Sequence, residues 1–410
     1  MATKKTYRQY ARVIVSAGVN LKKGEILVIN APITAKELVL EVTKAAYKKG
    51  ADRVYVDWRD DDVGKLSLTM GGGRRQLEPA KWEIDYKQYM VDNGVCYLNM
   101  LSGDPELYAD VDKELLVKVA RARYMNFAFF SDAVTENLIK WCIVGVPDLA
   151  WAKKVFPDLT PKAALNKLWE YVTHTMRLDT ANPLAAWKEH NENLKRRSKI
   201  LNEMGLKRLH YTNALGTDLW LGLPDGYVFE GGSEKHRKGS TFNPNMPTEE
   251  IFSAPYKYGV DGKVVASMPL YHNGAKVSGF GFVFEKGKIV DYWAEEGKEI
   301  LEGILGTDEG SRYLGEVALV PYDSPISNLQ TLFLETLFDE NASCHLAIGT
   351  AYPSCVKGGL EMDEEELEKA GINVSHEHVD FMIGTSDLRI DGETADGAVV
   401  EIFVNGNFAF

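Results

Sequence analysis

Residues 375–385 place two histidines and an aspartate at alternate positions, in the order His376, His378 and Asp380. In an extended strand every second side chain points to the same face, so these three groups would share one face. Imidazole nitrogens and carboxylate oxygens are ligands that divalent metal ions take from proteins. The apolar run 381–383 would carry the strand into the core and hold the ligands rigidly. A solvated surface strand has the same spacing, so this stretch alone leaves both interpretations open.

Two further segments carry carboxylates that an ordinary fold does not need. Residues 245–255 place Glu249 and Glu250 between prolines, directly before an apolar pair that should enter the core. Residues 315–321 form a nearly continuous apolar strand with Glu316 close to its start. A buried glutamate is costly unless it is paired or bound to a metal ion. A solvated acid at the edge of a strand is the alternative interpretation of Glu316.

A third segment, residues 338–353, combines a helix end, a polar turn and an apolar strand. His345 stands at the entrance of this strand, Glu340 precedes it and Tyr352 follows it. A single histidine at such a place is more often structural than a ligand, but three polar groups around one strand favour a functional site. Because Tyr352 lies an odd number of positions, seven, after His345, a continuous strand would place the two side chains on opposite faces, and the chain must turn at residues 349–351 if both approach one point.

Four blocks of the sequence together resemble the thermophilic metallo-aminopeptidase family, namely residues 245–250, 315–317, 342–353 and 378–384. The resemblance covers the whole chain in length and in the order of the blocks. Members of this family are dimeric metallo-exopeptidases with two divalent ions in each active site. The resemblance therefore implies a homodimeric enzyme that acts on peptides with a free N-terminus.

The resemblance also implies a set of metal ligands, all from the second half of the chain: Glu250, Glu316, Glu340, His345, His378 and Asp380. It places Tyr352 beside the metal ions and leaves His376 outside the motif. Strand alternation alone therefore counts one ligand too many in residues 375–385. Glu316 and Tyr352 are the residues to which the resemblance and their chemistry assign catalytic roles.

These residue types fit the chemistry of a dinuclear hydrolase. Two ions roughly 3.5–4 Å apart and bridged by a carboxylate can deprotonate a water and polarise a scissile carbonyl. Glu316 is the natural bridge, and the mixed oxygen and nitrogen ligands suit zinc, cobalt or manganese. The Tyr352 hydroxyl would donate a hydrogen bond to the oxyanion or bind a metal as phenolate. We therefore expect an aminopeptidase that removes N-terminal residues through a metal-activated water.

Two other functions remain open at this point. A dinuclear hydrolase of another kind, such as an amidase acting on a non-peptide substrate, would use the same ligands. A metal-binding scaffold or peptide-binding module without turnover would need fewer of them, and the full ligand set disfavours it. The chain has neither an HExxH nor a GxSxG motif. The glycine run at residues 71–75 is not followed by the lysine of a phosphate-binding loop, so a surface loop is favoured there.

The first half of the chain has the pattern of an α/β domain. A helical pattern at residues 36–49 follows the first of four short apolar runs, at residues 24–30, 54–58, 95–100 and 141–147. Apolar runs that alternate with helices predict a mainly parallel sheet covered by helices. A densely charged helical pattern at residues 187–204 predicts a solvated connector between domains.

The second half has shorter strands separated by glycine and proline, with helical patterns at residues 328–338 and 363–370. The predicted fold class is therefore α/β, with an N-terminal α/β domain at residues 1–204. The predicted C-terminal domain at residues 205–410 is α+β, rich in strands, and carries the metal ligands.

The composition restricts the class of protein. With 410 residues, of which 45% are hydrophobic and 26% charged, the chain has the size and composition of a two-domain soluble protein. A net charge of −12 disfavours nucleic acids and anionic membranes as partners. No apolar run predicts a membrane span, and the N-terminal segment lacks the pattern of a secretory signal. Four cysteines without CxxC spacing indicate reduced thiols and a cytoplasmic location.

Overall fold

The computed structural model describes residues 2–272 and 275–410. Contacts within the chain divide it into two compact units, Met1–Glu189 with Ser233–Pro247, and His190–Gly232 with Thr248–Phe410. The first unit thus includes a short segment from the second half of the sequence. The domain boundary expected between residues 204 and 205 stays a prediction.

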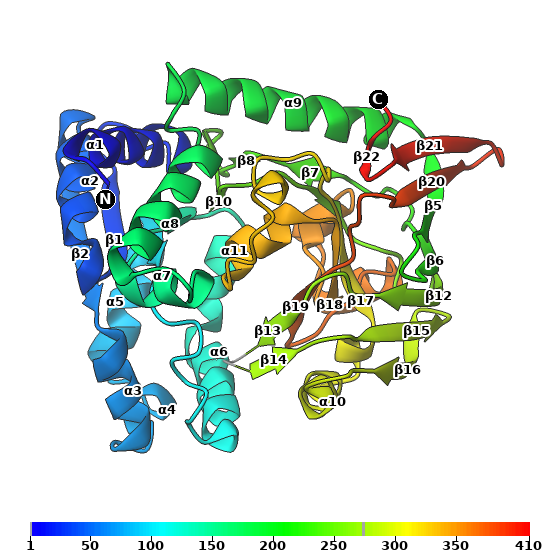
Figure 1. Cartoon of the computed structure of the whole chain (residues 1–410), viewed down its shortest axis with the longest axis horizontal. Helices are drawn as coiled ribbons and strands as arrows, with labels where there is room; N and C mark the ends of the chain where they lie inside the picture. Colours follow the sequence, from blue (N-terminus) through cyan, green and yellow to red (C-terminus); the bar gives the residue numbers. More distant parts are fainter. Residues whose placement is uncertain (1, 273–274) are drawn as a thin grey trace. The chain divides into compact units, whose positions relative to one another are not determined.

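The first unit is built on a five-stranded sheet with the order β10-β4-β3-β1-β2. Figure 1 labels the neighbouring strands β1 and β2 of this sheet. All of its pairs are parallel. Its strands are β1 (Ile26–Pro32), β2 (Arg53–Arg59), β3 (Cys96–Leu101), β4 (Lys140–Gly145) and β10 (Asn245–Met246). The interior strand β1, between β3 and β2, buries Leu27, Val28 and Ile29 completely, as expected of a strand covered on both faces. The prediction of an N-terminal α/β architecture with a mainly parallel sheet is confirmed.

Helices precede the first of these strands and lie between the others in the sequence, and the last helix continues into the second unit from His190. They are α1 (Lys4–Val13), α2 (Lys36–Lys48), α3 (Asp61–Thr69), α4 (Arg74–Leu77), α5 (Lys81–Asp92), α6 (Lys113–Thr135), α7 (Leu149–Val155), α8 (Pro161–Thr175) and α9 (Pro183–Glu203). The helix α2 contacts β1 and β2 and buries Leu38, Val42 and Ala46, which the helical period places on one face. Among the helices of the described residues, none combines the length and apolar character needed to cross a membrane.

The second unit contains two large antiparallel sheets and a two-stranded antiparallel sheet of β13 (Leu270–His272) and β14 (Ala275–Val277) (Figure 1). The five-stranded sheet has the order β19-β18-β17-β11-β7, with β7 (Glu230–Gly231), β11 (Ile251–Ser253), β17 (Leu314–Leu319), β18 (His345–Gly349) and β19 (His378–Met382). The eight-stranded sheet has the order β16-β15-β12-β6-β5-β20-β21-β22, with β5 (Leu206–Thr212), β6 (Asp218–Gly222), β12 (Val260–Val265), β15 (Gly281–Glu285), β16 (Lys288–Trp293), β20 (Arg389–Thr394), β21 (Val399–Val404) and β22 (Asn407–Phe408). The predicted strand-rich character of the C-terminal part is confirmed.

One hydrophobic core serves both sheets of the second unit. Val317, Leu346 and Phe381 from the five-stranded sheet belong to the same buried cluster as Leu209 and Val264 from the eight-stranded sheet. Burial of each such side chain contributes about 1.5–3 kcal/mol. The five-stranded sheet therefore has one apolar face packed in the core, which leaves its other face for polar side chains.

The prediction of a helix at residues 328–338 is wrong. Only a 3₁₀ turn at Ser327–Leu329 and the short helix α11 (Thr336–Asp339) form there. Gln330 and Leu334 have φ angles of 46° and 60°, which lie in the left-handed region and cannot continue a right-handed helix. The helix predicted at residues 363–370 is present as α12 (Glu364–Lys369).

Candidate metal centre

The candidate ligands lie on the polar face of the five-stranded sheet because they alternate with core residues. On β17, Glu316 alternates with Val317, and on β18 His345 alternates with Leu346. On β19 the two ligands His378 and Asp380 likewise flank Val379, which is buried in the core. Because successive side chains point to opposite faces, each strand places its core residues on one face of the sheet and its candidate ligands on the other.

Strand register brings these groups together. Glu316 pairs with Ala347, and Ala347 pairs with Asp380 on the next strand. Ala318 pairs with His345. The alanines are small, so the longer ligand side chains can meet above them. These contacts depend on pairing between segments that are distant in the sequence.

Gly315 allows the turn that supports His378. The pairing of β17 with β18 is irregular between Leu314 and Glu316. A Cβ atom on Gly315 would lie 2.3 Å from the carbonyl oxygens of both Gly349 and Thr350, so only glycine fits this close approach. The carbonyl oxygen of Thr350 in turn lies 2.9 Å from His378 Nδ1.

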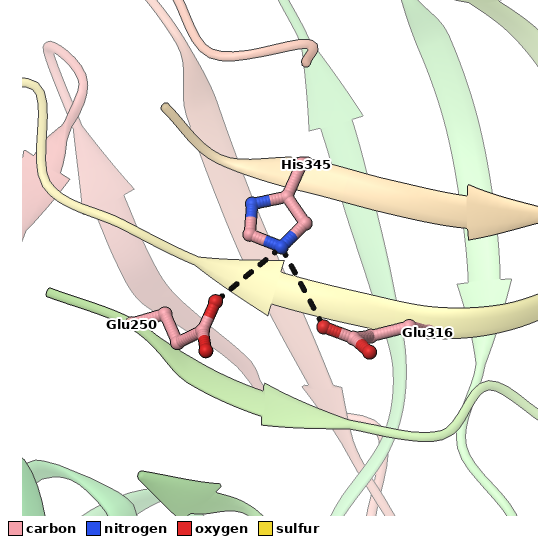
Figure 2. A group of neighbouring side chains, drawn as sticks. All are labelled: Glu250, Glu316 and His345. Carbon is pink, nitrogen blue, oxygen red and sulfur yellow. Dashed lines mark ion pairs between the residues drawn. The ribbon is translucent and has the colours of Figure 1, made fainter. Parts of the chain in front are cut away.

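Glu316 lies at the centre of the site. Its Oε1 is 3.5 Å from His345 Nε2, and its Oε2 is 3.4 Å from His378 Nε2. Figure 2 shows His345 between two carboxylates, with Glu250 Oε2 at 3.4 Å from the same Nε2. His378 Nε2 also lies 3.3 Å from Asp380 Oδ1. Two groups that could each hold a cation result, Glu250 with Glu316 and His345, and Glu316 with His378 and Asp380.

Hydrogen bonds fix the orientation of both imidazoles. His345 Nδ1 lies 3.0 Å from the carbonyl oxygen of Ser343, and His378 Nδ1 makes the corresponding contact with Thr350. A carbonyl oxygen only accepts hydrogen bonds, so both Nδ1 atoms donate. The Nε2 atoms therefore face the carboxylates. A neutral imidazole would direct its Nε2 lone pair at these oxygens, so a proton or a metal ion must lie between them.

The charges at the site shift its pKa values strongly. Burial raises the pKa of Glu316, but hydrogen bonds with His345 and His378 outweigh it and lower the pKa to about 2. Burial lowers the pKa of His345, but its contact with Glu316 and the charge of Glu250 raise the pKa to about 10. The charge of Asp380 likewise overcomes burial and raises the pKa of His378 well above its usual value. Before a metal ion binds, both imidazoles are therefore protonated on Nε2 as well as on Nδ1 at neutral pH and carry a positive charge.

Metal-free protein prepared by chelation is expected to release protons when it binds zinc or cobalt. His345 and His378 must lose their protons before Nε2 can act as a ligand, because their raised pKa values keep them protonated at neutral pH. The apparent affinity should therefore rise with pH, by about tenfold per pH unit for each proton displaced. Calorimetric titration in two buffers of different ionisation enthalpy measures the number of protons released. A binding enthalpy that is the same in both buffers would show that the histidines are neutral before binding.

The donor set fits divalent transition ions. Three carboxylates and two imidazoles converge from β17, β18, β19 and the residue before β11, and each imidazole is held in the tautomer that a metal ligand requires. All five residues belong to the second unit. Among the described residues, the two close groups contain Glu250, Glu316, His345, His378 and Asp380, which are five of the six predicted ligands.

Glu340 and Tyr352 lie beside these groups. Burial and the charges of Asp380 and Glu250 raise the pKa of Glu340 well above its usual value, and Asn341 Nδ2 donates to Glu340 Oε1 at 3.3 Å. The ring of Tyr352 packs edge-on against the ring of His378, with the centroids 5.6 Å apart. The strand β18 ends at Gly349, which has a φ of 106°, so the turn predicted at residues 349–351 is confirmed.

His376 lies outside the site. The strand β19 begins at His378, so the strand face first suggested by residues 375–385 does not extend back to His376. Its side chain is exposed, and its backbone N–H donates to Asp308 Oδ2 at 2.6 Å. Within the described ranges neither candidate cation group includes His376. The prediction that His376, His378 and Asp380 share one strand face is therefore wrong, because His376 lies before the strand.

The sequence did not reveal the residues that hold the ligands in place. The side chain of Asn341 is completely buried, accepts from Glu249 N at 2.8 Å and donates to Leu337 O at 2.9 Å. It thereby links the segment before β11 to the turn that carries Glu340. The carbonyl groups of Ser343 and Thr350 carry no signal of residue type. The asparagine could have been suspected because a buried amide requires several partners.

Comparison with known proteins gives a consistent result. The model of the thermophilic metalloprotease (M29) family matches residues 3–408. Aminopeptidase AmpS of Bacillus subtilis (strain 168) is 43% identical to this chain over 401 residues, which cover 98% of each chain. Aminopeptidase T of Thermus aquaticus is 36% identical over 398 residues, or 97% of each chain.

A solved structure also matches the fold of this chain. The solved structure of wild-type AmpT from Thermus thermophilus matches this chain with a TM-score of 0.93 at 34% identity, and 100% of both chains are covered. The resemblance drawn from the four sequence blocks is confirmed by the family match and by these relatives. This chain is a metallo-aminopeptidase that belongs to the thermophilic metalloprotease (M29) family.

Proposed function

We propose that this chain is a dinuclear metal-dependent aminopeptidase, which hydrolyses N-terminal residues from peptides through a metal-activated water. One observation carries the dinuclear part of the proposal. The two carboxylate oxygens of Glu316 face two different histidines, at 3.5 Å and 3.4 Å, and Glu316 belongs to both candidate cation groups. A carboxylate with this environment suits a bridge between two ions.

The proposed ligands are divided between the two ions. Glu250 and His345 would hold one ion, His378 and Asp380 would hold the other, and Glu316 would bind both. We keep Glu340 as a sixth ligand, because a further carboxylate shielded from water beside Asp380 and Glu250 needs a cation or a proton. When bound, the ions supply the Lewis acidity that lowers the pKa of a water and polarises the scissile carbonyl.

The side chains of the protein orient the reaction. Ser343 and Thr350 accept hydrogen bonds from the two imidazoles and so keep both Nε2 atoms directed at Glu316. Tyr352 is 38% exposed, so its hydroxyl can reach a substrate while its ring stays packed against His378. We propose that this hydroxyl donates a hydrogen bond to the oxygen on which negative charge develops during hydrolysis.

Zinc, cobalt and manganese all suit this mixture of oxygen and nitrogen ligands. We further propose that the protein is a homodimer of the cytoplasm. The four cysteines are free and buried, which fits a reducing compartment.

Peptides that differ only at their N-terminus test the proposal. The purified protein should hydrolyse leucine p-nitroanilide and a leucyl dipeptide but not the N-acetylated dipeptide. Chelation should abolish turnover, and addition of zinc, cobalt or manganese should restore it together with two bound ions per chain.

Each competing function gives a different result in this assay. Equal hydrolysis of the acetylated peptide, or turnover restricted to non-peptide amides, would favour a different dinuclear hydrolase. Tight metal binding without turnover of any substrate would indicate a binding module. Full activity with one ion per chain would refute the dinuclear proposal alone.

A further inference from the structure

Glu230 is a carboxylate on the polar face of the five-stranded sheet that the proposed metal chemistry does not use. It lies in β7 at the edge of the sheet, directly opposite Phe252 of β11. Directly paired residues of antiparallel strands place their side chains on the same face. Glu250 precedes Phe252 by two positions, so Glu230, Phe252 and Glu250 share this face.

Among the described residues, the carboxylate of Glu230 has one polar side-chain partner, and that partner is uncharged. Ser354 Oγ donates to Glu230 Oε2 at 2.7 Å. In the described part of the chain no lysine, arginine or histidine forms an ion pair with this carboxylate. Burial raises the pKa of Glu230 in spite of the Ser354 hydrogen bond, which reflects the same lack of a neighbouring cation. A half-buried carboxylate in this environment is stabilised by a cation from a ligand.

The aromatic rings of Tyr352 and Phe252 lie between the candidate metal centre and Glu230. The Tyr352 ring lies 5.6 Å from the ring of His378 and 5.8 Å from the ring of Phe252, and Phe252 is paired with Glu230. Phe252 is half-buried and Tyr352 is exposed. The aliphatic stem of a lysine or arginine packs favourably on such rings, and its charge interacts with their faces.

The distance between the strands determines whether the α-ammonium group or a cationic side chain of the peptide can reach Glu230. Two strand spacings separate β7 from β17, so Glu230 is on the order of 10 Å from Glu316. The α-ammonium group of a substrate is joined through one carbon to the scissile carbonyl, so it must stay near the metal centre. A lysine or arginine side chain extends about 6–7 Å beyond its Cα atom and can cover the remaining distance.

We propose that Glu230 recognises the cationic side chain of a lysine or arginine at the N-terminus of the peptide, with Phe252 and Tyr352 flanking its aliphatic stem. This inference rests on the proposed aminopeptidase function. Glu230 is then a specificity residue, which distinguishes charged from neutral side chains of similar shape.

Arginine and citrulline test this role, because the two side chains have nearly the same shape and differ in charge. The kcat/KM values for their 7-amido-4-methylcoumarin derivatives would be measured for the wild-type protein and for Glu230→Gln. The wild-type protein should favour arginine, and Glu230→Gln should reduce the ratio of arginine to citrulline by about 10- to 100-fold. Hydrolysis of the citrulline and leucine substrates should stay within about twofold of wild type, since these substrates present no charge to Glu230.

Ser354→Ala is the matched control. It removes the Ser354 hydrogen bond to the Glu230 carboxylate but leaves the charge in place, so the preference for arginine should persist. If Glu230 only anchors the turn after Tyr352, both variants would lower kcat/KM for all substrates equally and the proposal would be overturned. An effect confined to alanyl-arginine against alanyl-citrulline dipeptides would place the cation on the second residue and would also overturn it. A wild-type protein that hydrolyses no aminoacyl substrate would refute the proposed function itself.

Discussion

Replacement of Glu316 by glutamine is expected to lower kcat by about 10³-fold or more, because several kcal/mol of transition-state stabilisation are lost with the bridge. The amide retains the volume of the carboxylate but offers one oxygen and one NH₂ group. The oxygen can face only one of the two histidines, and the NH₂ group would donate to Nε2 of the other and block it as a ligand. Metal analysis should therefore show fewer than two ions per chain, while circular dichroism shows an intact fold.

Glu377→Gln is the matched control for this variant. The carboxylate of Glu377 accepts a hydrogen bond from Thr307 Oγ1 at 2.9 Å, which a glutamine oxygen can also accept. Both Glu377→Gln and His376→Ala should retain most of the activity, because neither residue belongs to a candidate cation group of the described residues. Turnover near the wild-type rate with two bound ions in Glu316→Gln would exclude a bridging role for Glu316.

The sequence predicted the elements whose patterns are local. The parallel strand β1 buries its apolar run Leu27–Ile29, and α2 buries the face that its period of 3.6 residues defines. The ligand strands also follow from local alternation, because His378 and Asp380 are two positions apart. These patterns can be read from the chain because the burial of each residue depends on its neighbours in the same element.

Other features depend on contacts that no local pattern contains. The strand β10 has only two residues, Asn245 and Met246, and it forms by pairing with β4 far earlier in the sequence. The false helix at residues 328–338 has a helical sequence without glycine or proline. It is broken because the Asp339 carboxylate accepts a hydrogen bond from Phe333 N at 2.6 Å, which holds the intervening chain in a turn.

The geometry of the site was predictable in residue type but not in arrangement. A histidine and a carboxylate at alternate positions suggest ligands, yet they do not show which oxygen of Glu316 faces which ring. That depends on the register in which Ala347 pairs with Glu316 on one side and with Asp380 on the other. His376 illustrates the converse, since its spacing matches that of a ligand but the strand starts two residues later.

Replacement of Tyr352 by phenylalanine is expected to lower kcat by about 10²-fold, the usual cost of removing one hydrogen-bond donor to an oxyanion. The ring contacts with His378 and Phe252 do not involve the hydroxyl, so they should persist in the variant. Metal content should stay at the wild-type level, and KM should change little if the hydroxyl acts only when charge develops in the transition state. Steady-state kinetics with metal analysis of the same samples measures both effects.

Tyr258→Phe is the control for loss of a tyrosine hydroxyl elsewhere in the same unit. Tyr258 is 49% exposed and packs on Tyr256 and Tyr313 instead of on a candidate ligand, so its variant should keep wild-type kcat. An unchanged kcat in Tyr352→Phe would remove this hydroxyl from catalysis. Loss of one metal ion would instead identify the phenolate oxygen as a ligand, and the fall in rate would then follow metal occupancy and be corrected by excess metal. Because the oxyanion role predicts no such rescue, titration with metal separates the two roles of Tyr352.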